Sequence, residues 1–330
     1  MNPTVTLEEI YAPIDRQLEA VGDTILEILS NRNDLTQEVV RYFFSAKGKL
    51  LRPALTLLGA SVKGASADSE RQALRLGSAF EIFHSATLIH DDIIDSAAIR
   101  RNLQTVHLKW SPQVAVLVGD YLHDQAIKAV FETRNQEVVE LFLKTAGEVC
   151  DGEIHELKER SNFALTEDVY LDIVDKKTAS LLACTLACGG LMAGASPVEK
   201  KALYAFGQNF GIAFQIIDDV LDLTGSEAEF GKTLGADCMA GVLTLPFIHF
   251  FTVADADKKE SLKGLLQSDF TGGHFQSILS LLRDEGSVDY ALRRAQEFSD
   301  KARKELRVFD DSPARRSLER LLDYVLERSK

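Results

Sequence analysis

Two short acidic motifs carry the residues of this sequence that could do chemistry. They are LIHDDIID, with Asp91, Asp92 and Asp95, and QIIDDVLD, with Asp218, Asp219 and Asp222. In a helix, the first and last aspartates of each motif lie roughly 6 Å apart along the axis and share a face. Like charges at this spacing destabilise a helix by roughly a few tenths of a kcal/mol, and aspartate is itself a poor helix former. Because the surrounding residues are apolar, something should compensate for the repulsion between these carboxylates.

One such motif in an acidic protein is more often a solvated patch at a helix end, by roughly three to one. The repeat of the pattern 127 residues later reverses these odds. Facing each other across a helical bundle, the motifs would supply six carboxylates, the hard oxygen ligands that Mg²⁺ completes with water and substrate phosphate. Zinc is a poor candidate, since no histidine or cysteine joins the motifs at metal-ligand spacing.

A magnesium site of this kind predicts an anionic ligand, and the basic residues that could hold one lie in short groups. Taken singly, each is more often a solvated surface charge. Arg100 and Arg101 are the exception, because adjacent guanidinium groups after a carboxylate cluster suit bidentate phosphate recognition. The other candidates are Lys49 and Arg52 in GKLLRP, Lys176 and Lys177 before Thr178, and Lys232 in FGKTLG.

Long helices are expected to position these residues. The 330 residues include only 21 glycines and 7 prolines, which are few turn signals for an all-β chain. No alternation of period two calls for a sheet, and no Pro-, Ser- or Gly-rich linker divides the chain. One apolar stripe runs along a helix near the N-terminus, through Ile10, Ile14, Leu18, Val21, Ile25 and Ile28. The sequence therefore predicts an all-α bundle in a single domain, residues 1–330.

The charge excludes some partners. A net charge of −13, without long basic runs, argues against nucleic acid and against anionic membranes. Residues 178–198 hold 21 uncharged residues, long enough on paper to cross a bilayer. Because glycine and alanine are frequent there, a closely packed buried helix explains the segment better, and no stable membrane insertion is expected.

A reducing cytoplasm is the expected compartment. The four cysteines, Cys150, Cys184, Cys188 and Cys238, form no CxxC pair and indicate neither a zinc site nor a disulfide scaffold. The N-terminal residues show no basic segment followed by an apolar one, so no signal peptide is predicted.

Together these motifs resemble those of the trans-polyprenyl diphosphate synthases, in particular long-chain members such as octaprenyl diphosphate synthases. These are head-to-tail prenyltransferases with the helical isoprenoid synthase fold. The resemblance covers nearly the whole chain, and the number, order and spacing of the motifs make it specific. They are GKLLRP (48–53), HSATLIHDDIIDSAAIRR (84–101), VLVGDYL (116–122), KT (177–178), FQIIDDVLDLTG (214–225), GKTLGAD (231–237) and TLP (244–246).

The resemblance implies a role for each motif. Three Mg²⁺ ions on an allylic diphosphate would be held by Asp91, Asp95 and Asp218, assisted by Asp92, Asp219 and Asp222. The same diphosphate would contact Arg100, Lys177 and Lys232. Isopentenyl diphosphate would lie against Gly48, Lys49, Arg52, His84 and Arg101. The oxygens of Thr178 and Gln215 would lie near the allylic cation, which the isopentenyl double bond attacks, and the departed diphosphate would take the final proton.

The sequence departs from this family at four positions. Asn102 and Gln104 replace the usual glycine and proline after the arginine pair, so the loop there is expected to bend differently. Val242 stands where a lysine is common, which removes a positive charge near the diphosphates. Glu156 replaces a residue that is often glutamine in long-chain and aspartate in short-chain members, and could add a metal ligand.

The length of the product is expected to depend on residues one and two turns before Asp91. Ala86 and Thr87 share its face of the helix. Short-chain members carry an aromatic residue near this point, so small side chains indicate a medium or long product. Phe83 and Phe142 are the candidate floor, although a helical phenylalanine is more commonly a core residue.

Two other functions stay open. A terpene cyclase on the same fold needs no second diphosphate site, so Lys49, Arg52 and Arg101 favour a synthase. A noncatalytic regulatory subunit usually lacks one aspartate motif, whereas both are complete here. His90, His123, Cys184 and Cys188 are expected to be structural. The resemblance also implies a homodimer.

Overall fold

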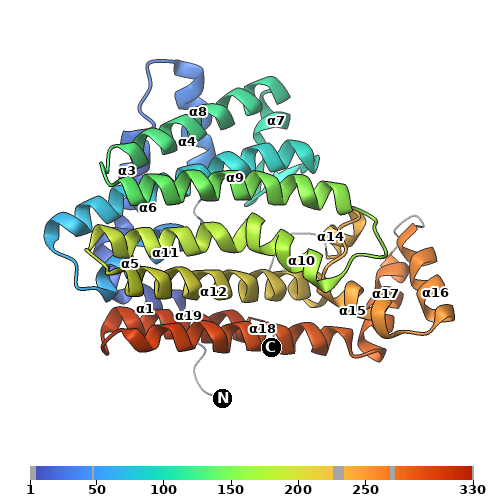
Figure 1. Cartoon of the computed structure of the whole chain (residues 1–330). Helices are drawn as coiled ribbons and strands as arrows, with labels where there is room; N and C mark the ends of the chain where they lie inside the picture. The colour runs from blue at the N-terminus through green and yellow to red at the C-terminus, as the bar shows by residue number, and fades with distance from the viewer. Residues whose placement is uncertain (1–4, 47, 226–233, 268–271, 329–330) are drawn as a thin grey trace.

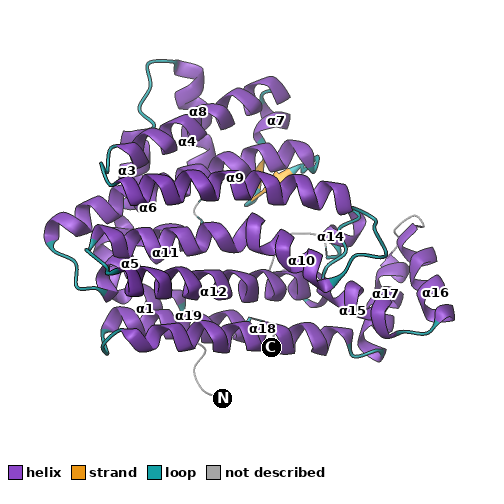
Figure 2. Cartoon of the chain, in the orientation of Figure 1, coloured by secondary structure: helices purple, strands orange, loops and turns teal. Residues whose placement is uncertain are grey.

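The computed structural model describes residues 5–46, 48–225, 234–267 and 272–328. These residues are mainly helical, which confirms the predicted all-α fold (Figures 1 and 2). One short β-hairpin departs from that prediction: its two strands, β1 (Ile99–Arg100) and β2 (Leu103–Gln104), are antiparallel and have two residues each.

The described helices follow in chain order. The first group comprises α1 (Leu7–Tyr11), η1 (Ala12–Ile14), α2 (Asp15–Glu19), α3 (Val21–Ile28), α4 (Asp34–Ser45), α5 (Leu51–Val62), α6 (Ala67–Ile94), α7 (Val106–Lys109), α8 (Pro112–Phe131) and α9 (Gln136–Glu159). The second comprises α10 (Glu167–Val174), η2 (Asp175–Ala179), α11 (Ser180–Met192), α12 (Pro197–Thr224), α14 (Ala236–Met239), α15 (Leu245–Val253), α16 (Ala256–Gln267), α17 (Gly272–Asp284), α18 (Ser287–Glu305), η3 (Leu306–Val308) and α19 (Pro313–Glu327).

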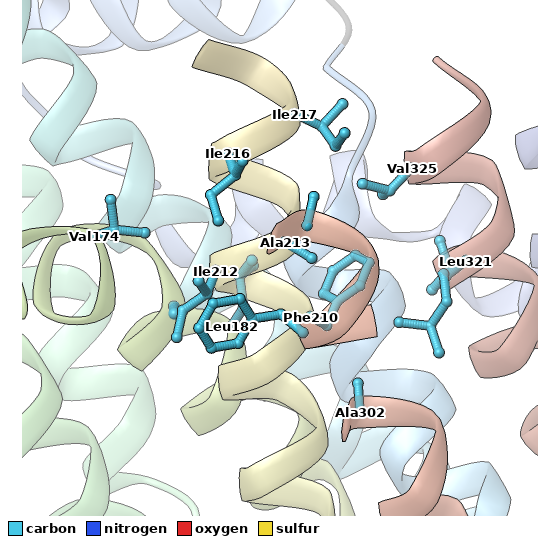
Figure 3. Close-up of a cluster of buried hydrophobic side chains, with 14 of the residues drawn as sticks. Val174, Leu182, Phe210, Ile212, Ala213, Ile216, Ile217, Ala302, Leu321 and Val325 are labelled. Atoms are coloured by element: carbon cyan, nitrogen blue, oxygen red, sulfur yellow. The ribbon is translucent and has the colours of Figure 1, made fainter. Parts of the chain in front are cut away.

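Long helices stack in layers around α11 (Figure 1). Helix α12 packs on α11 and α18, while α6 packs on α5 and α8. One apolar cluster lies around α12, where Phe210, Ala213 and Ile217 meet side chains of α18 and α19 (Figure 3). A second cluster joins α6, α8, α9 and one face of α11. The two aspartate motifs thus stand on the long helices α6 and α12, at their C-terminal ends.

Helix α11 comprises residues 180–192 of the uncharged segment and is buried, as predicted. The rest of residues 178–198 forms the end of η2, a turn and the start of α12, where Val198 is exposed. The glycines of α11 allow close contact with α5. A Cβ atom added at Gly189 would lie 2.0 Å from the Thr56 carbonyl oxygen, and one at Gly59 would lie 2.2 Å from that of Leu186. None of the described helices has both the length and the apolarity for a membrane span.

The apolar stripe near the N-terminus does face the core, but the expected single helix is wrong. Ile10, Ile14, Val21 and Ile25 are buried. The chain forms α1, η1, α2 and α3 in place of one helix. The break lies at Pro13, which has no N–H to donate and whose ring clashes with the preceding turn of an α-helix.

Candidate active site

Asp91 lies in the last turn of α6, where it is partly buried. Burial, followed by the negative charge of Glu153 on α9, raises the pKa of Asp91 to about 7, against the opposing effect of Lys177. A divalent cation beside this carboxyl group would favour its ionised form. The site of Asp91 therefore suits a metal ligand, because the negative charge of its carboxylate is costly there unless a cation balances it.

The other two carboxylates of the first motif accept hydrogen bonds from arginines. Asp92 is buried, and its Oδ1 accepts from Arg100 Nε at 2.6 Å. Asp95 is the C-cap of α6, and its Oδ1 accepts from Arg160 Nη2 at 2.7 Å. Arg100, expected on the diphosphate, thus also braces the motif itself.

In the second motif, Asp219 is buried and belongs to a chain of hydrogen bonds. Tyr170 Oη donates to its Oδ2 at 2.6 Å, and Gln215 Nε2 donates to its Oδ1 at 2.8 Å. Gln215 in turn accepts from Thr178 Oγ1 at 2.9 Å. The hydroxyl proton of Thr178 is therefore engaged, which leaves its oxygen lone pairs available toward a neighbouring positive charge.

Asp218 and Asp222 have separate surroundings. Asp222 accepts hydrogen bonds from the backbone N–H groups of Ala236 and Asp237 at 3.2 and 3.3 Å, so it holds the start of α14. Asp218 accepts from Arg328 Nη2 at 3.1 Å. The second motif thus combines three different carboxylates: Asp219 is buried, Asp222 holds the start of α14, and Asp218 is exposed.

Lys177 and Thr178 lie in η2, a single turn of π-helix, a geometry that is frequent at functional sites. Gly152 of α9 allows this turn to approach, because a Cβ there would lie 2.7 Å from the Lys177 backbone nitrogen. Lys177 Nζ contacts Glu153 at 2.8 Å and Glu156 at 2.6 Å. Burial lowers the pKa of Lys177, but these two carboxylates outweigh it and raise the pKa above its usual value.

These elements enclose a cavity of about 790 Å³. Asp95 from the first motif and Asp219 from the second both line it, as do Lys177, Thr178 and Gln215. The structure therefore brings the two motifs, 127 residues apart in sequence, to one cavity. Val242 is on the same wall, so the position that lacks the expected lysine faces this space.

A second group of basic residues comes from three elements: Arg52 on α5, His84 on α6 and Arg101 in the turn between β1 and β2. Burial and the positive charge of Arg101 lower the pKa of Arg52 to about 10, against the opposing effect of Glu81. Burial and both arginines lower the pKa of His84. The guanidinium group of Arg101 lies against Gly48, where a Cβ would be 2.8 Å from its Nη2. The two guanidinium groups repel each other, so a bound anion beside them would be favoured.

Lys49 connects this basic group to the second motif. Its pKa is lowered by burial and by Arg328, against the opposing effect of Asp218. The pocket expected for isopentenyl diphosphate and the carboxylates expected for magnesium are therefore neighbours.

The turn after the arginine pair adopts left-handed backbone. Arg101 and Asn102 have φ angles of 49° and 63° between the strands β1 and β2. Asparagine tolerates this conformation better than most residues other than glycine, so Asn102 suits the place usually held by glycine. Gln104 pairs with Ile99 in the hairpin and its carbonyl accepts a hydrogen bond from Tyr42 Oη at 2.9 Å.

The residues expected to control chain length lie on α6 and α9. Ala86, Phe83 and Phe142 are buried in one apolar cluster, and the rings of Phe83 and Phe142 meet edge to face with centroids 5.2 Å apart. Thr87 is only half-buried, and its hydroxyl donates to the His84 carbonyl oxygen at 2.8 Å. Ala86 thus faces the aromatic cluster more directly than Thr87.

The chemistry of the side chains around the cavity suits magnesium. Carboxylate oxygens suit this ion, and Asp95 and Asp219 line the cavity. Of the three expected ligands, Asp95 is on the cavity wall, whereas Asp91 and Asp218 are not among the described residues that line it. Among the residues that the structure describes, no three acidic side chains form a ready-made metal site. Arg160 donates to Oδ1 of Asp95 and Arg328 donates to Oδ1 of Asp218, so a metal ion that took these two oxygens would displace the arginines.

Sequence reasoning missed several of these residues. Arg160, Tyr170, Glu81, Glu153 and Arg328 contact or influence the candidate residues, but they stand outside the aspartate and lysine motifs and no spacing pointed to them. Lys232, expected on the diphosphate, lies outside the described residues.

Comparisons with known proteins agree with this geometry. Residues 33–282 match the model of the polyprenyl synthetase family. The all-trans-nonaprenyl-diphosphate synthase of Rhodobacter capsulatus is 32% identical over 97% of this chain and 98% of its own, and the geranylgeranyl diphosphate synthase of Methanosarcina mazei is 33% identical over 94% of each. The Caulobacter crescentus polyprenyl synthase, solved with calcium and isoprenyl diphosphate, superimposes with a TM-score of 0.91 at 29% identity over the full length of both chains. The chain therefore belongs to the polyprenyl synthetase family and is a trans-prenyltransferase with the isoprenoid synthase fold.

Proposed function

We propose that the protein condenses isopentenyl diphosphate with an allylic prenyl diphosphate and repeats this step to make a medium- or long-chain polyprenyl diphosphate. The observation that carries the proposal is the pairing of two sites. A cavity lined by both aspartate motifs adjoins a separate basic group, which comprises the half-buried Arg52 and His84 and the exposed Arg101. A cyclase acting on one diphosphate would need only the first site.

The residues can be given roles in ionisation. The allylic C–O bond breaks, and the diphosphate leaves with both electrons of that bond. Bound Mg²⁺ would neutralise charge on the leaving group as a Lewis acid. Lys177 and Arg100 add positive charge at the same wall, and their carboxylate partners hold them in place before the bond breaks.

The residues also have roles after ionisation. Thr178 and Gln215 present oxygens toward the allylic cation, while the buried walls keep water away from it. Arg52 and Arg101 hold the diphosphate of the isopentenyl unit while its double bond forms the new C–C bond. Loss of a proton to the departed diphosphate restores a double bond.

The proposed product is longer than a short-chain prenyl diphosphate. Ala86, five residues before Asp91 on α6, is a small side chain in the same buried cluster as the rings of Phe83 and Phe142, so it would obstruct a growing tail less than an aromatic residue would. Relatives of nearly equal identity carry nonaprenyl and geranylgeranyl names, so these side chains are the support for a longer product.

Incubation with Mg²⁺, isopentenyl diphosphate and, separately, ten-, fifteen- and twenty-carbon allylic primers tests the proposal. Mass spectrometry should show a ladder that ends near one chain length. Hydrocarbon release from a primer alone would indicate a cyclase, and complete inactivity would indicate a missing partner subunit; either result contradicts the proposal.

We also propose a homodimer in the cytoplasm. Leu143, Ile154 and Leu157 form one exposed apolar stripe along α9, which a second copy could cover. The four unpaired cysteines suit a reducing compartment. In sedimentation velocity, Ile154→Glu should shift the protein to a monomer, whereas Val198→Glu, at an equally exposed site on α12, should not. A wild-type monomer would contradict the dimer.

A further inference from the structure

Arg160 lies at the C-terminal end of α9, on the wall of the cavity that both aspartate motifs line. The backbone there is held by a specific contact, because Ser161 N–H donates to the Gly241 carbonyl oxygen at 2.7 Å. Both Ser161 and Gly241 have left-handed backbone, with φ angles of 58° and 79°. Residue 160 is therefore held beside the loop that carries Val242, which lines the same cavity.

The guanidinium group of Arg160 is directed at this cavity and is only partly bonded. Its Nη2 donates to Asp95, while its buried Nε has no acceptor among the described residues. The side chain is 25% exposed. An arginine offers five N–H donors in a planar fork, so the group keeps capacity for a further oxygen ligand.

The partner of Arg160 distinguishes it from the other basic residues of the cavity. Lys177 is held between two glutamates, and Arg100 is held by the buried Asp92. Arg160 is instead paired with Asp95, a carboxylate expected to hold magnesium. A metal ion on Asp95 would weaken this ion pair, since the carboxylate would then share its charge with the metal.

We propose that Arg160 is a diphosphate-binding residue, which supplies from α9 a positive charge to the wall where Val242 supplies none. The anion is a diphosphate bound together with Mg²⁺, and its identity as the allylic substrate rests on the proposed function. With magnesium on Asp95, the guanidinium group of Arg160 would be free to turn from this carboxylate to the diphosphate oxygens. Its planar fork suits two phosphate oxygens at once.

Calorimetric titration of the purified full-length chain with inorganic pyrophosphate in excess Mg²⁺ tests this role without turnover. Arg160→Gln should weaken binding roughly ten- to a hundredfold, the usual cost of a hydrogen bond to a charged group. Lys158→Gln is the matched control, since this side chain is on the same helix and is exposed. It should bind within about twofold of the wild type.

The sign of the change separates the proposal from a purely structural role. If Arg160 only held Asp95, its removal would free that carboxylate for the metal and tighten the binding of magnesium pyrophosphate. Tighter or unchanged binding by Arg160→Gln would therefore overturn the proposal. Arg160→Lys, which keeps the charge without the fork, should bind between the wild type and the glutamine variant. If the glutamine variant does not fold, full wild-type affinity in the lysine variant would equally overturn it.

A charge returned at the neighbouring position gives a second test. Val242→Lys in the Arg160→Gln background should recover at least tenfold of the lost affinity, because the lysine reaches the same wall. If the double variant still binds magnesium pyrophosphate as weakly as Arg160→Gln does, the claim that this wall of the cavity needs a positive charge is overturned. The elongation assay remains separate: a wild type that elongates no primer refutes the proposed function, while the pyrophosphate affinities still decide the role of Arg160.

Discussion

Replacement of Phe142 by alanine should lengthen the product. Phe142 of α9 is buried, and its ring lies 5.2 Å from that of Phe83 and 5.8 Å from that of Phe80, centroid to centroid. These rings close the apolar cluster beyond Ala86, where the growing tail is expected to arrive. Removing the middle ring opens space in line with the tail.

The size of the effect follows from the buried ring. The truncation removes a six-carbon ring, slightly more than the five carbons of one isoprene unit. Loss of a buried phenylalanine costs about 3–5 kcal/mol of folding free energy. At about 0.8 kcal/mol per buried carbon group, an isoprene unit in the same space would contribute about 4 kcal/mol. A product tail that is longer by one isoprene unit would therefore nearly offset the folding free energy lost with the ring. The dominant product should lengthen by one isoprene unit, or by two units if the ring of Phe83 also moves aside.

The assay is mass spectrometry of the products with isopentenyl diphosphate in excess over a fifteen-carbon primer. Phe206→Ala is the matched control, because Phe206 is equally buried but stacks on Phe210 in the other apolar cluster. It should lower the free energy of unfolding by a similar amount and leave the product unchanged.

The reasoning would be refuted by a folded, active Phe142→Ala enzyme whose products match those of the wild type. Equal lengthening by Phe206→Ala would also refute it, because general loosening of the bundle would then explain the change.

Three further predictions concern the site. Burial and Glu153 raise the pKa of Asp91 to about 7. Between about pH 4 and pH 7 the folded protein therefore keeps a proton on Asp91 that the unfolded chain releases. The free energy of unfolding, measured in EDTA, should accordingly fall as the pH rises through this range. Asp91→Asn should flatten this fall in urea titrations, and an unchanged slope would contradict the assignment. Tyr170→Phe should cost about 1–3 kcal/mol of stability and lower kcat, since Asp219 loses its donor at 2.6 Å; wild-type stability would count against this. Glu81→Gln removes the negative charge that faces Arg52, so it should raise the KM for isopentenyl diphosphate and leave the KM for the primer unchanged. A parallel rise in both KM values would disprove a specific effect.

Some features of the fold could be predicted from the sequence because they depend on the local spacing of apolar and small residues. The apolar residues before Asp91 and Asp218 predicted the helices α6 and α12, and the small uncharged residues of 178–198 predicted a buried helix. The break at Pro13 could have been predicted from the missing N–H, but the regular stripe concealed it. The hairpin at 99–104 is too short to leave any alternation.

By itself, the sequence determined that two aspartate motifs stand on helices with apolar surroundings and that basic residues accompany them. Residue type and helical period are local properties, and these were sufficient for that inference. Only the tertiary structure decided which partner each carboxylate contacts. Asp219 is held by Tyr170, Asp95 by Arg160 and Asp218 by Arg328, partners 49, 65 and 110 residues away. Charges act through space, so the pKa of a carboxyl group and the partner of an arginine depend on how distant helices pack.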